Sequence, residues 1–332
     1  MPDSQQSLPD PLSYTDMGRL KELLKEWMLP LALVSGISIY LIYHFIPALH
    51  PIGPACHRIV SVSQRVTIAI MLFLQFVKVS PHDLKLTRWH LYAALCQLIS
   101  SFGIALVVMY TPHGEIRILL ECAMICLICP TAAAAGVITD RLGGTLSATM
   151  TYVVLINTLA TFAIPTMIPL IHPSAELGFW QYVLGIAAKI FPLLLLPSLL
   201  AWIIRYTMRR LQRFLMRRAH WAFYIWGIGL TLAMILATRA LATSHLGFGV
   251  IICIVMVSVA CCALQFFAGR HLGKDHAECI TAGQALGQKN TGFMIWLGYA
   301  YLTPITSVVG GLYAIWQNIF NSWELFRHEH GK

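Results

Sequence analysis

Long apolar runs, separated by short polar or charged stretches, fill this chain from residue 28 to residue 325. The runs are continuous and rich in Leu, Ile, Val and Ala, whereas a half-buried strand alternates apolar and polar residues. A helix of this length crosses the ~30 Å hydrocarbon layer of a bilayer and satisfies its own backbone hydrogen bonds there. The pattern predicts an all-α polytopic membrane protein with ten transmembrane helices, at 28–47, 59–79, 89–110, 115–139, 145–171, 178–204, 220–240, 246–268, 276–300 and 304–325.

The composition excludes a soluble domain. Of the 332 residues 58% are hydrophobic and only 11% are charged, and the mean hydropathy is +0.70, so no water-soluble fold would cover the apolar surface. The net charge of +9 does not indicate a nucleic-acid partner, because the Lys and Arg residues lie mostly in the connections between the apolar runs. The partner that this composition predicts is the lipid bilayer.

The basic residues are divided unequally between alternate connections. One set of connections carries seventeen Lys and Arg residues and the other carries three, Arg58, Arg117 and Arg239. Positively charged loops stay in the cytoplasm, so we expect both termini to be cytoplasmic, in a multi-pass protein of a bacterial-type inner (plasma) membrane. Residues 1–27 lack the apolar core of a signal peptide and predict a cytoplasmic segment with an amphipathic helix; residues 326–332 form the cytoplasmic tail.

The fourth helix of each set of five carries a polar or helix-breaking interruption. The first reads ECAMICLICPTAAAAGVITD, with Pro130 inside it, and the second reads ECITAGQALGQKNTGFMIWL, with Gly283 and Gly287. Because five is odd, two five-helix halves, 28–171 and 172–325, would have opposite orientations in the membrane. Interrupted helices at matching positions of two inverted repeats are typical of the binding site of a secondary transporter.

These segments resemble the bile acid:sodium symporter family. The resemblance extends over almost the whole chain and is carried by MLFLQFVKVSPHDLK, by Gln97, by CPTAAAAGVITDRLGG and, most specifically, by GQALGQKNTGF. It implies ten helices in two inverted repeats, with helices 4 and 9 broken and crossing. It also implies alternating access, in which a core built around the crossing moves against a panel of helices 1, 2, 6 and 7.

The resemblance implies a sodium site that this chain alters. The family's Ser-Asn pair falls on Ala135 and Gly136, its acidic residue falls on Ala285 or Gln284, and a Gln falls on Lys289. Sodium needs several oxygen ligands and an offsetting negative charge, so we expect sodium coupling to be weakened or replaced, by uniport or with H⁺ in place of Na⁺. The candidate ion-binding residues are Gln97, Thr149, Gln284 and Glu121.

Lys289 is the residue on which we place most weight. An ammonium group at bilayer depth costs at least ~2.5 kcal/mol, so it persists where it meets water, a partner or a substrate. It would act as a fixed counter-charge for a carboxylate or sulfonate, or as a proton carrier; a structural alternative locks it against Glu278 or a carbonyl. The candidate substrate-binding residues are Lys289, Asn290, Thr291, Gln288, Gln284, Thr131, Asn157 and Asn318.

Three functions remain open. The leading hypothesis is a secondary transporter of organic anions, either bile-acid-like molecules or small carboxylates. The alternatives are a membrane receptor or sensor that binds a ligand without moving it, and an arsenite or metal permease that uses Cys122, Cys126 and Cys129, which share one helix face. No catalytic motif is present, so we expect no enzyme activity, no organic cofactor and no resident metal.

Overall fold

The computed structural model describes residues 27–330 except 133, 219–220 and 245. These residues form an all-helical structure, 85% helix, with no strand among them. The amphipathic helix predicted within residues 1–27 lies outside the described part of the chain, apart from Trp27. The α-helices are α2 (Met28–Phe45), α3 (Gly53–Phe76), α4 (Arg88–Tyr110), α5 (Glu115–Ile128), α6 (Ala135–Arg141), α7 (Leu146–Ile171), α8 (Phe179–Leu194), α9 (Leu196–Thr207), α10 (Arg209–Arg217), α11 (Trp221–Ala242), α12 (Phe248–Leu272), α13 (His276–Gly287), α14 (Thr291–Tyr301) and α15 (Ser307–Glu329), with short 3-10 helices η1 (Pro47–Ile52), η2 (Pro81–Asp83) and η3 (Pro304–Thr306).

Several of these helices are long and apolar enough to cross a membrane. Five meet this test alone: α3 with η1, α4, α7, α11 and α12; the pair α8 and α9, bent by 40°, makes a sixth. The chain is therefore a polytopic helical membrane protein. The count falls short of ten partly because two of the predicted spans are divided, which leaves α5, α13 and α14 with only 14, 12 and 11 residues. The final helix runs to Glu329, past the boundary predicted at residue 325.

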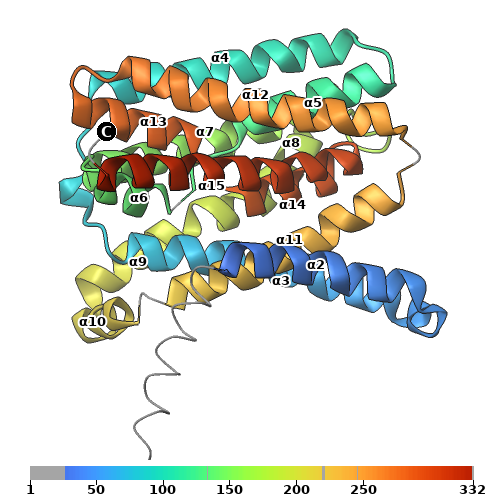
Figure 1. The fold of residues 1–332 in the computed structure, drawn as a ribbon, viewed down its shortest axis with the longest axis horizontal. Helices are drawn as coiled ribbons and strands as arrows, with labels where there is room; N and C mark the ends of the chain where they lie inside the picture. Colours follow the sequence, from blue (N-terminus) through green and yellow to red (C-terminus); the bar gives the residue numbers. More distant parts are fainter. Residues whose placement is uncertain (1–26, 133, 219–220, 245, 331–332) are drawn as a thin grey trace, which may run out of the picture.

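The helices form two groups that lie one above the other in Figure 1. The lower group, which we call the panel, contains α2, α3, α9, α10 and α11. The upper group, the core, contains α4 to α7 and α12 to α15, and α8 lies between the groups in contact with both α3 and α7. Further contacts between the groups are made by α14 against α3 and by α11 against α14 and α15.

Close packing within the core depends on small residues. A Cβ atom added at Gly269 of α12 would lie 2.4 Å from the backbone oxygen of Ala282 in α13, so the two helices touch at this point through their backbones. Apolar burial gives no preference for helix–helix contact in lipid, so such packing supplies much of the attraction between membrane helices.

The connections predicted to be cytoplasmic gather at one end of the molecule. The C-terminal end, α6, α10 and the start of α13 lie together at the left of Figure 1. At this end the side chain of Arg205 donates a hydrogen bond to the backbone oxygen of Val77 (3.5 Å). Residues 46–52, 111–114 and 172–178 lie at the opposite end, where Arg117 of α5 is paired with Glu121.

Candidate functional site at the crossing of two interrupted helices

Both predicted interruptions are present. The first helix stops at Ile128 and resumes at Ala135, on either side of Pro130, whose ring cannot continue a helix and carries no N–H. The second stops at Gly287 and resumes at Thr291. Each interruption frees backbone groups that a continuous helix would have paired.

The two interrupted segments pair with each other. Thr131 and Lys289 form an antiparallel β-bridge, in which the Ala132 N–H donates to the Gln288 oxygen (3.0 Å) and the Asn290 N–H donates to the Pro130 oxygen (2.9 Å). Buried backbone groups need partners, and here each break supplies them to the other. The two helices therefore meet at their breaks, deep in the core.

Lys289 projects from this crossing and is completely buried. Its ammonium group donates a hydrogen bond to the side-chain oxygen of Gln97 on α4 (2.9 Å). The structural alternative paired Lys289 with Glu278. The carboxylate of Glu278 instead accepts a hydrogen bond from the backbone N–H of Lys274 (3.0 Å). Among the described residues no carboxylate lies within ion-pair distance of the ammonium.

Gln97 is held in place by its other contacts. Its amide nitrogen donates to the backbone oxygens of Ile128 (3.2 Å) and Cys129 (3.0 Å), at the end of α5 where helical partners are missing. Its oxygen then faces Lys289 and also accepts the hydroxyl of Tyr152 on α7 (3.0 Å). Lys289 thus meets a neutral oxygen that is already shared with a second donor.

A row of polar side chains on α15 faces the second break. Gln317 accepts the backbone N–H of Lys289 (2.9 Å), Asn321 accepts from the side chain of Gln288 (3.2 Å), and Glu324 accepts from the side chain of Gln284 and pairs with Arg270. Gln317 and Glu324 were not predicted from the sequence as site residues, although the spacing of four and three places them on one helix face with Asn321.

The predicted residues of the breaks serve the crossing in different ways. The hydroxyl of Thr131 donates to the Ala285 oxygen (2.6 Å). The side chain of Asn290 caps α14 by accepting the Phe293 N–H (3.1 Å), and Gln288 also donates to Gln284. Thr291, the first residue of α14, is buried. These contacts tie the break to its own helices.

Three other predicted site residues form no hydrogen bond with Lys289 in the described part of the chain. The hydroxyl of Thr149 donates to that of Thr139 (3.1 Å), and Asn318 donates to the Ala314 oxygen of its own helix (2.7 Å). Asn157 of α7 is 1% exposed, and neither its amide nitrogen nor its amide oxygen has a partner within the described residues. A buried amide of this kind needs water or a ligand.

Glu121 belongs to a separate polar cluster at the end of the core opposite the basic connections. Its carboxylate accepts hydrogen bonds from Arg117 (3.3 Å), His172 (2.9 Å) and the Thr303 N–H (3.0 Å). Arg117 also donates to the backbone oxygens of Val108, Thr111 and Ile171. The cluster links α4, α5, α7 and η3. Its donors already occupy the carboxylate of Glu121, which was predicted as a candidate ion ligand.

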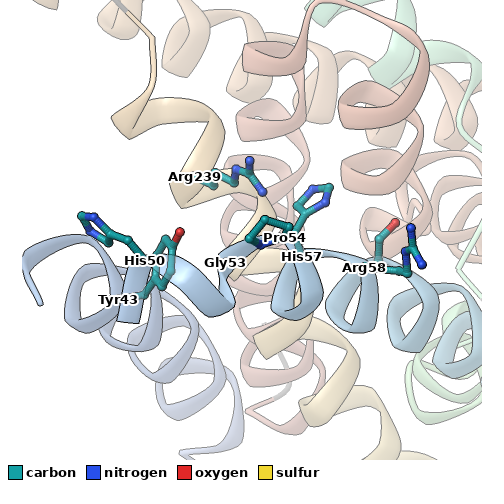
Figure 2. Close-up of a pocket in the computed structure, with 8 residues that line it drawn as sticks. Tyr43, His50, Gly53, Pro54, His57, Arg58 and Arg239 are labelled. Carbon is teal, nitrogen blue, oxygen red and sulfur yellow. The ribbon is translucent and has the colours of Figure 1, made fainter. Parts of the chain in front are cut away.

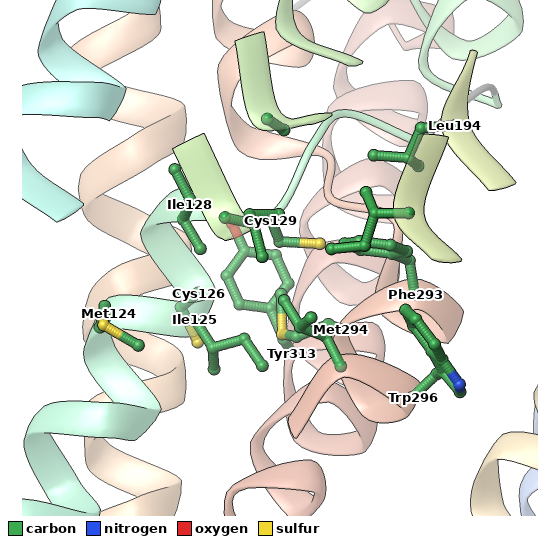
Figure 3. Packing of buried hydrophobic residues seen from close by; sticks show 14 of the residues in the cluster. Met124, Ile125, Cys126, Ile128, Cys129, Leu194, Phe293, Met294, Trp296 and Tyr313 are labelled. Atoms are coloured by element: carbon green, nitrogen blue, oxygen red, sulfur yellow. The ribbon is translucent and has the colours of Figure 1, made fainter. Parts of the chain in front are cut away.

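Apolar and sulfur-containing side chains surround the crossing. Figure 3 shows Cys126 of α5 and Cys129, the residue that follows α5, beside Met294 of α14 and the ring of Tyr313. The hydroxyl of Tyr313 donates to the Gly287 oxygen (2.7 Å). The thiol of Cys129 donates to the Asn290 oxygen (3.1 Å). In the described part of the chain no group of three or more His, Cys, Asp or Glu side chains is placed to hold a metal ion. The face of Cys122, Cys126 and Cys129 is thus part of the packing.

Two polar contacts join the panel to α14. Gln64 of α3 donates to the Gly292 oxygen (3.3 Å), just beyond the second break, while its own amide oxygen has no partner in the described residues. Seven residues earlier on the same face of α3, His57 and Tyr299 are hydrogen-bonded (3.1 Å). The panel therefore contacts the core beside the crossing and at the opposite end of α14.

Comparison with profiles of known protein families and with curated protein sequences gives no match for this chain.

Proposed function

We propose that this protein is a secondary transporter of organic anions with the ten-helix, inverted-repeat organisation of the bile acid:sodium symporter family. The observation that carries the proposal is the ammonium group of Lys289 at the crossing of two interrupted helices. Its one hydrogen-bond partner among the described residues is the neutral oxygen of Gln97. A buried cation without a carboxylate is a strong electrostatic attraction for an anion. The substrate class is a carboxylate or sulfonate, either bile-acid-like or small.

The proposed mechanism is alternating access. Lys289 and Thr131 are 0% exposed, so a substrate reaches the ammonium only after the core and the panel have moved relative to each other. The movement would break the two polar contacts that α3 makes with α14 through Gln64 and His57. It would also separate the apolar side chains of α3 and α11 that pack against α14. The side-chain amide of Asn157, which has no partner among the described residues, supplies a further hydrogen-bonding group for the substrate.

The coupling ion in this proposal is not sodium held at Lys289. A fixed ammonium group fills the place of a bound cation and repels a second one, so the organic anion would move by uniport, by exchange or with a proton. Two of the candidate sodium ligands already have other partners. Gln97 is hydrogen-bonded to the Lys289 ammonium, and Thr149 is hydrogen-bonded to the Thr139 hydroxyl.

Uptake by proteoliposomes tests the function. Vesicles containing the full-length protein are loaded with unlabelled cholate or benzoate, and entry of the same radiolabelled anion is followed by counterflow, with sodium gradients, with proton gradients and with neither. We expect counterflow without sodium, and no more than a small stimulation by a sodium gradient. Binding without counterflow would identify a receptor instead, and steep sodium dependence would contradict the assigned role of Lys289.

A further inference from the structure

A second cationic site lies far from Lys289, at the end of the panel opposite the basic connections. A pocket of about 690 Å³ opens there between the turn that joins α2 to α3 and the end of α11. Six of its lining residues carry polar or charged groups: Tyr43, His50, His57, Arg58, Ser61 and Arg239. None of the described residues that line it is acidic. The volume lies within the usual range for small-molecule sites.

The two arginines of this pocket form no ion pair with any residue that the structure describes. Three basic residues are predicted on this side of the membrane, and Arg117 is paired with Glu121. Within the described residues, neither the guanidinium of Arg58 nor that of the half-buried Arg239 forms an ion pair. Figure 2 shows the guanidinium of Arg239 and the imidazole of His57 on the same side of the α3 ribbon. A concave site with one sign of charge concentrates ions of the opposite sign.

The start of α3 is fitted to the pocket by a close contact. A Cβ atom added at Gly53 would lie 2.1 Å from the hydroxyl oxygen of Tyr43, so glycine lets this hydroxyl approach the backbone beside the two arginines. Tyr43, His57 and Ser61 line the same pocket and carry hydrogen-bonding groups. Together they provide several donors for an anionic oxygen, a chemistry in which arginine is favoured.

The pocket also marks one end of the contact line between the panel and the core. His57 contacts Tyr299 near the end of α14, and Gln64 contacts Gly292 at its start, three residues after Lys289. Seven residues of helix separate the two α3 positions by about 10 Å. One face of α3 therefore leads from the pocket to the crossing.

We propose that the pocket lined by Arg58 and Arg239 is an outer anion-binding site, which takes an organic carboxylate or sulfonate. Anion binding at this site does not depend on transport. Its further role, delivery of the anion along the α3–α14 contact to Lys289, rests on the proposed function.

Charged thiol reagents measure the electrostatic part of this proposal. Ser61→Cys is made in full-length protein whose exposed cysteines, Cys56, Cys96 and Cys253, are replaced by Ser. Its labelling rate is measured with an anionic sulfonatoethyl and a cationic trimethylammonioethyl methanethiosulfonate. We expect a higher anion-to-cation rate ratio than at Ser174→Cys, a matched position in the loop 172–178, and a fall of about threefold or more in Arg239→Gln or Arg58→Gln.

Matched variants complete this test. Arg210→Gln removes an exposed arginine at the opposite end of the protein, and Lys289→Met removes the cation of the crossing; both should leave the Ser61→Cys ratio unchanged. Equal ratios at Ser61→Cys with and without Arg58 and Arg239 would overturn the proposal.

Ligand binding supplies a second readout. Naphthalene-2-sulfonate is titrated into protein in nanodiscs, with the neutral naphthalene-2-sulfonamide as a control of equal shape. We expect the sulfonate to bind more tightly than the amide in Lys289→Met protein, and at least tenfold more weakly after Arg239→Gln. Equal binding of both compounds in Lys289→Met protein would overturn the outer site. Absence of counterflow in the unsubstituted protein, with this binding intact, would refute only the transport role.

Discussion

The ammonium group of Lys289 and the amide oxygen of Gln97 lie 2.9 Å apart, although 192 residues separate them in the chain. The same oxygen accepts the hydroxyl of Tyr152, so it remains hydrogen-bonded when the ammonium is removed. A substitution of Lys289 can therefore remove the positive charge without leaving the Gln97 oxygen unpaired. In the proposed function the charge attracts the anion, and we expect the hydrogen bond to contribute little to stability.

Lys289→Met is expected to abolish anion counterflow while leaving the protein folded. Met has a similar length, carries no charge, and leaves Gln97 with its Tyr152 partner, so the free energy of unfolding should fall by no more than ~1 kcal/mol. Counterflow of cholate or benzoate should fall at least tenfold, because the attraction of a buried charge for an anion is lost. Counterflow and thermal unfolding are measured on the same preparation. Unchanged counterflow with unchanged stability would show that Lys289 is structural.

The cluster of Arg117 and Glu121 is expected to stabilise the fold without binding the transported ion. Arg117→Met leaves the fully buried carboxylate of Glu121 without its guanidinium partner, which should lower the free energy of unfolding by about 3 kcal/mol or more. The measurement is equilibrium unfolding of the purified protein in mixed micelles. Glu115→Gln, at an exposed position of the same helix, is the matched control and should have no measurable effect.

A double variant checks the interpretation of that cluster. Arg117→Met with Glu121→Met removes both charges, so it should be more stable than Arg117→Met alone. If Arg117→Met and Glu115→Gln unfolded alike, the cluster would contribute nothing to the fold.

Local features of the sequence were sufficient to predict the two breaks. Pro130 and the glycines near Gly287 act on their own backbone, and the interruptions appear where these residues stand. The partner of Lys289 was not predictable in this way, because it depends on how α4 is placed against the break between α13 and α14. The polar face formed by Gln317, Asn321 and Glu324 carried a usable periodic signal, but its target, the second break, is a property of the tertiary fold.

The contact between α12 and α13 is expected to be intolerant of one added methyl group. Gly269→Ala would place a Cβ atom 2.4 Å from the Ala282 oxygen, and a backbone atom cannot move aside without separating the helices, so we expect a loss of about 2 kcal/mol or more. Gly103→Ala is the control, because nothing lies within 4 Å of the added Cβ atom in α4 and alanine favours a helix. Equal unfolding midpoints for the two variants would show that the close contact is absent in the membrane.

The orientation of the chain in the membrane is tested by labelling single cysteines from one side. Lys85 lies between η2 and α4, at the end where the basic connections gather, and Ser174 lies between α7 and α8 at the other end. In right-side-out vesicles of protein without its exposed cysteines, an impermeant maleimide should label Ser174→Cys directly, and Lys85→Cys only after the membrane is permeabilised. The reverse pattern would place both termini outside and the pocket of Arg239 in the cytoplasm. Such a pocket would receive anions leaving the cell, so this experiment also fixes the side from which Lys289 is first approached.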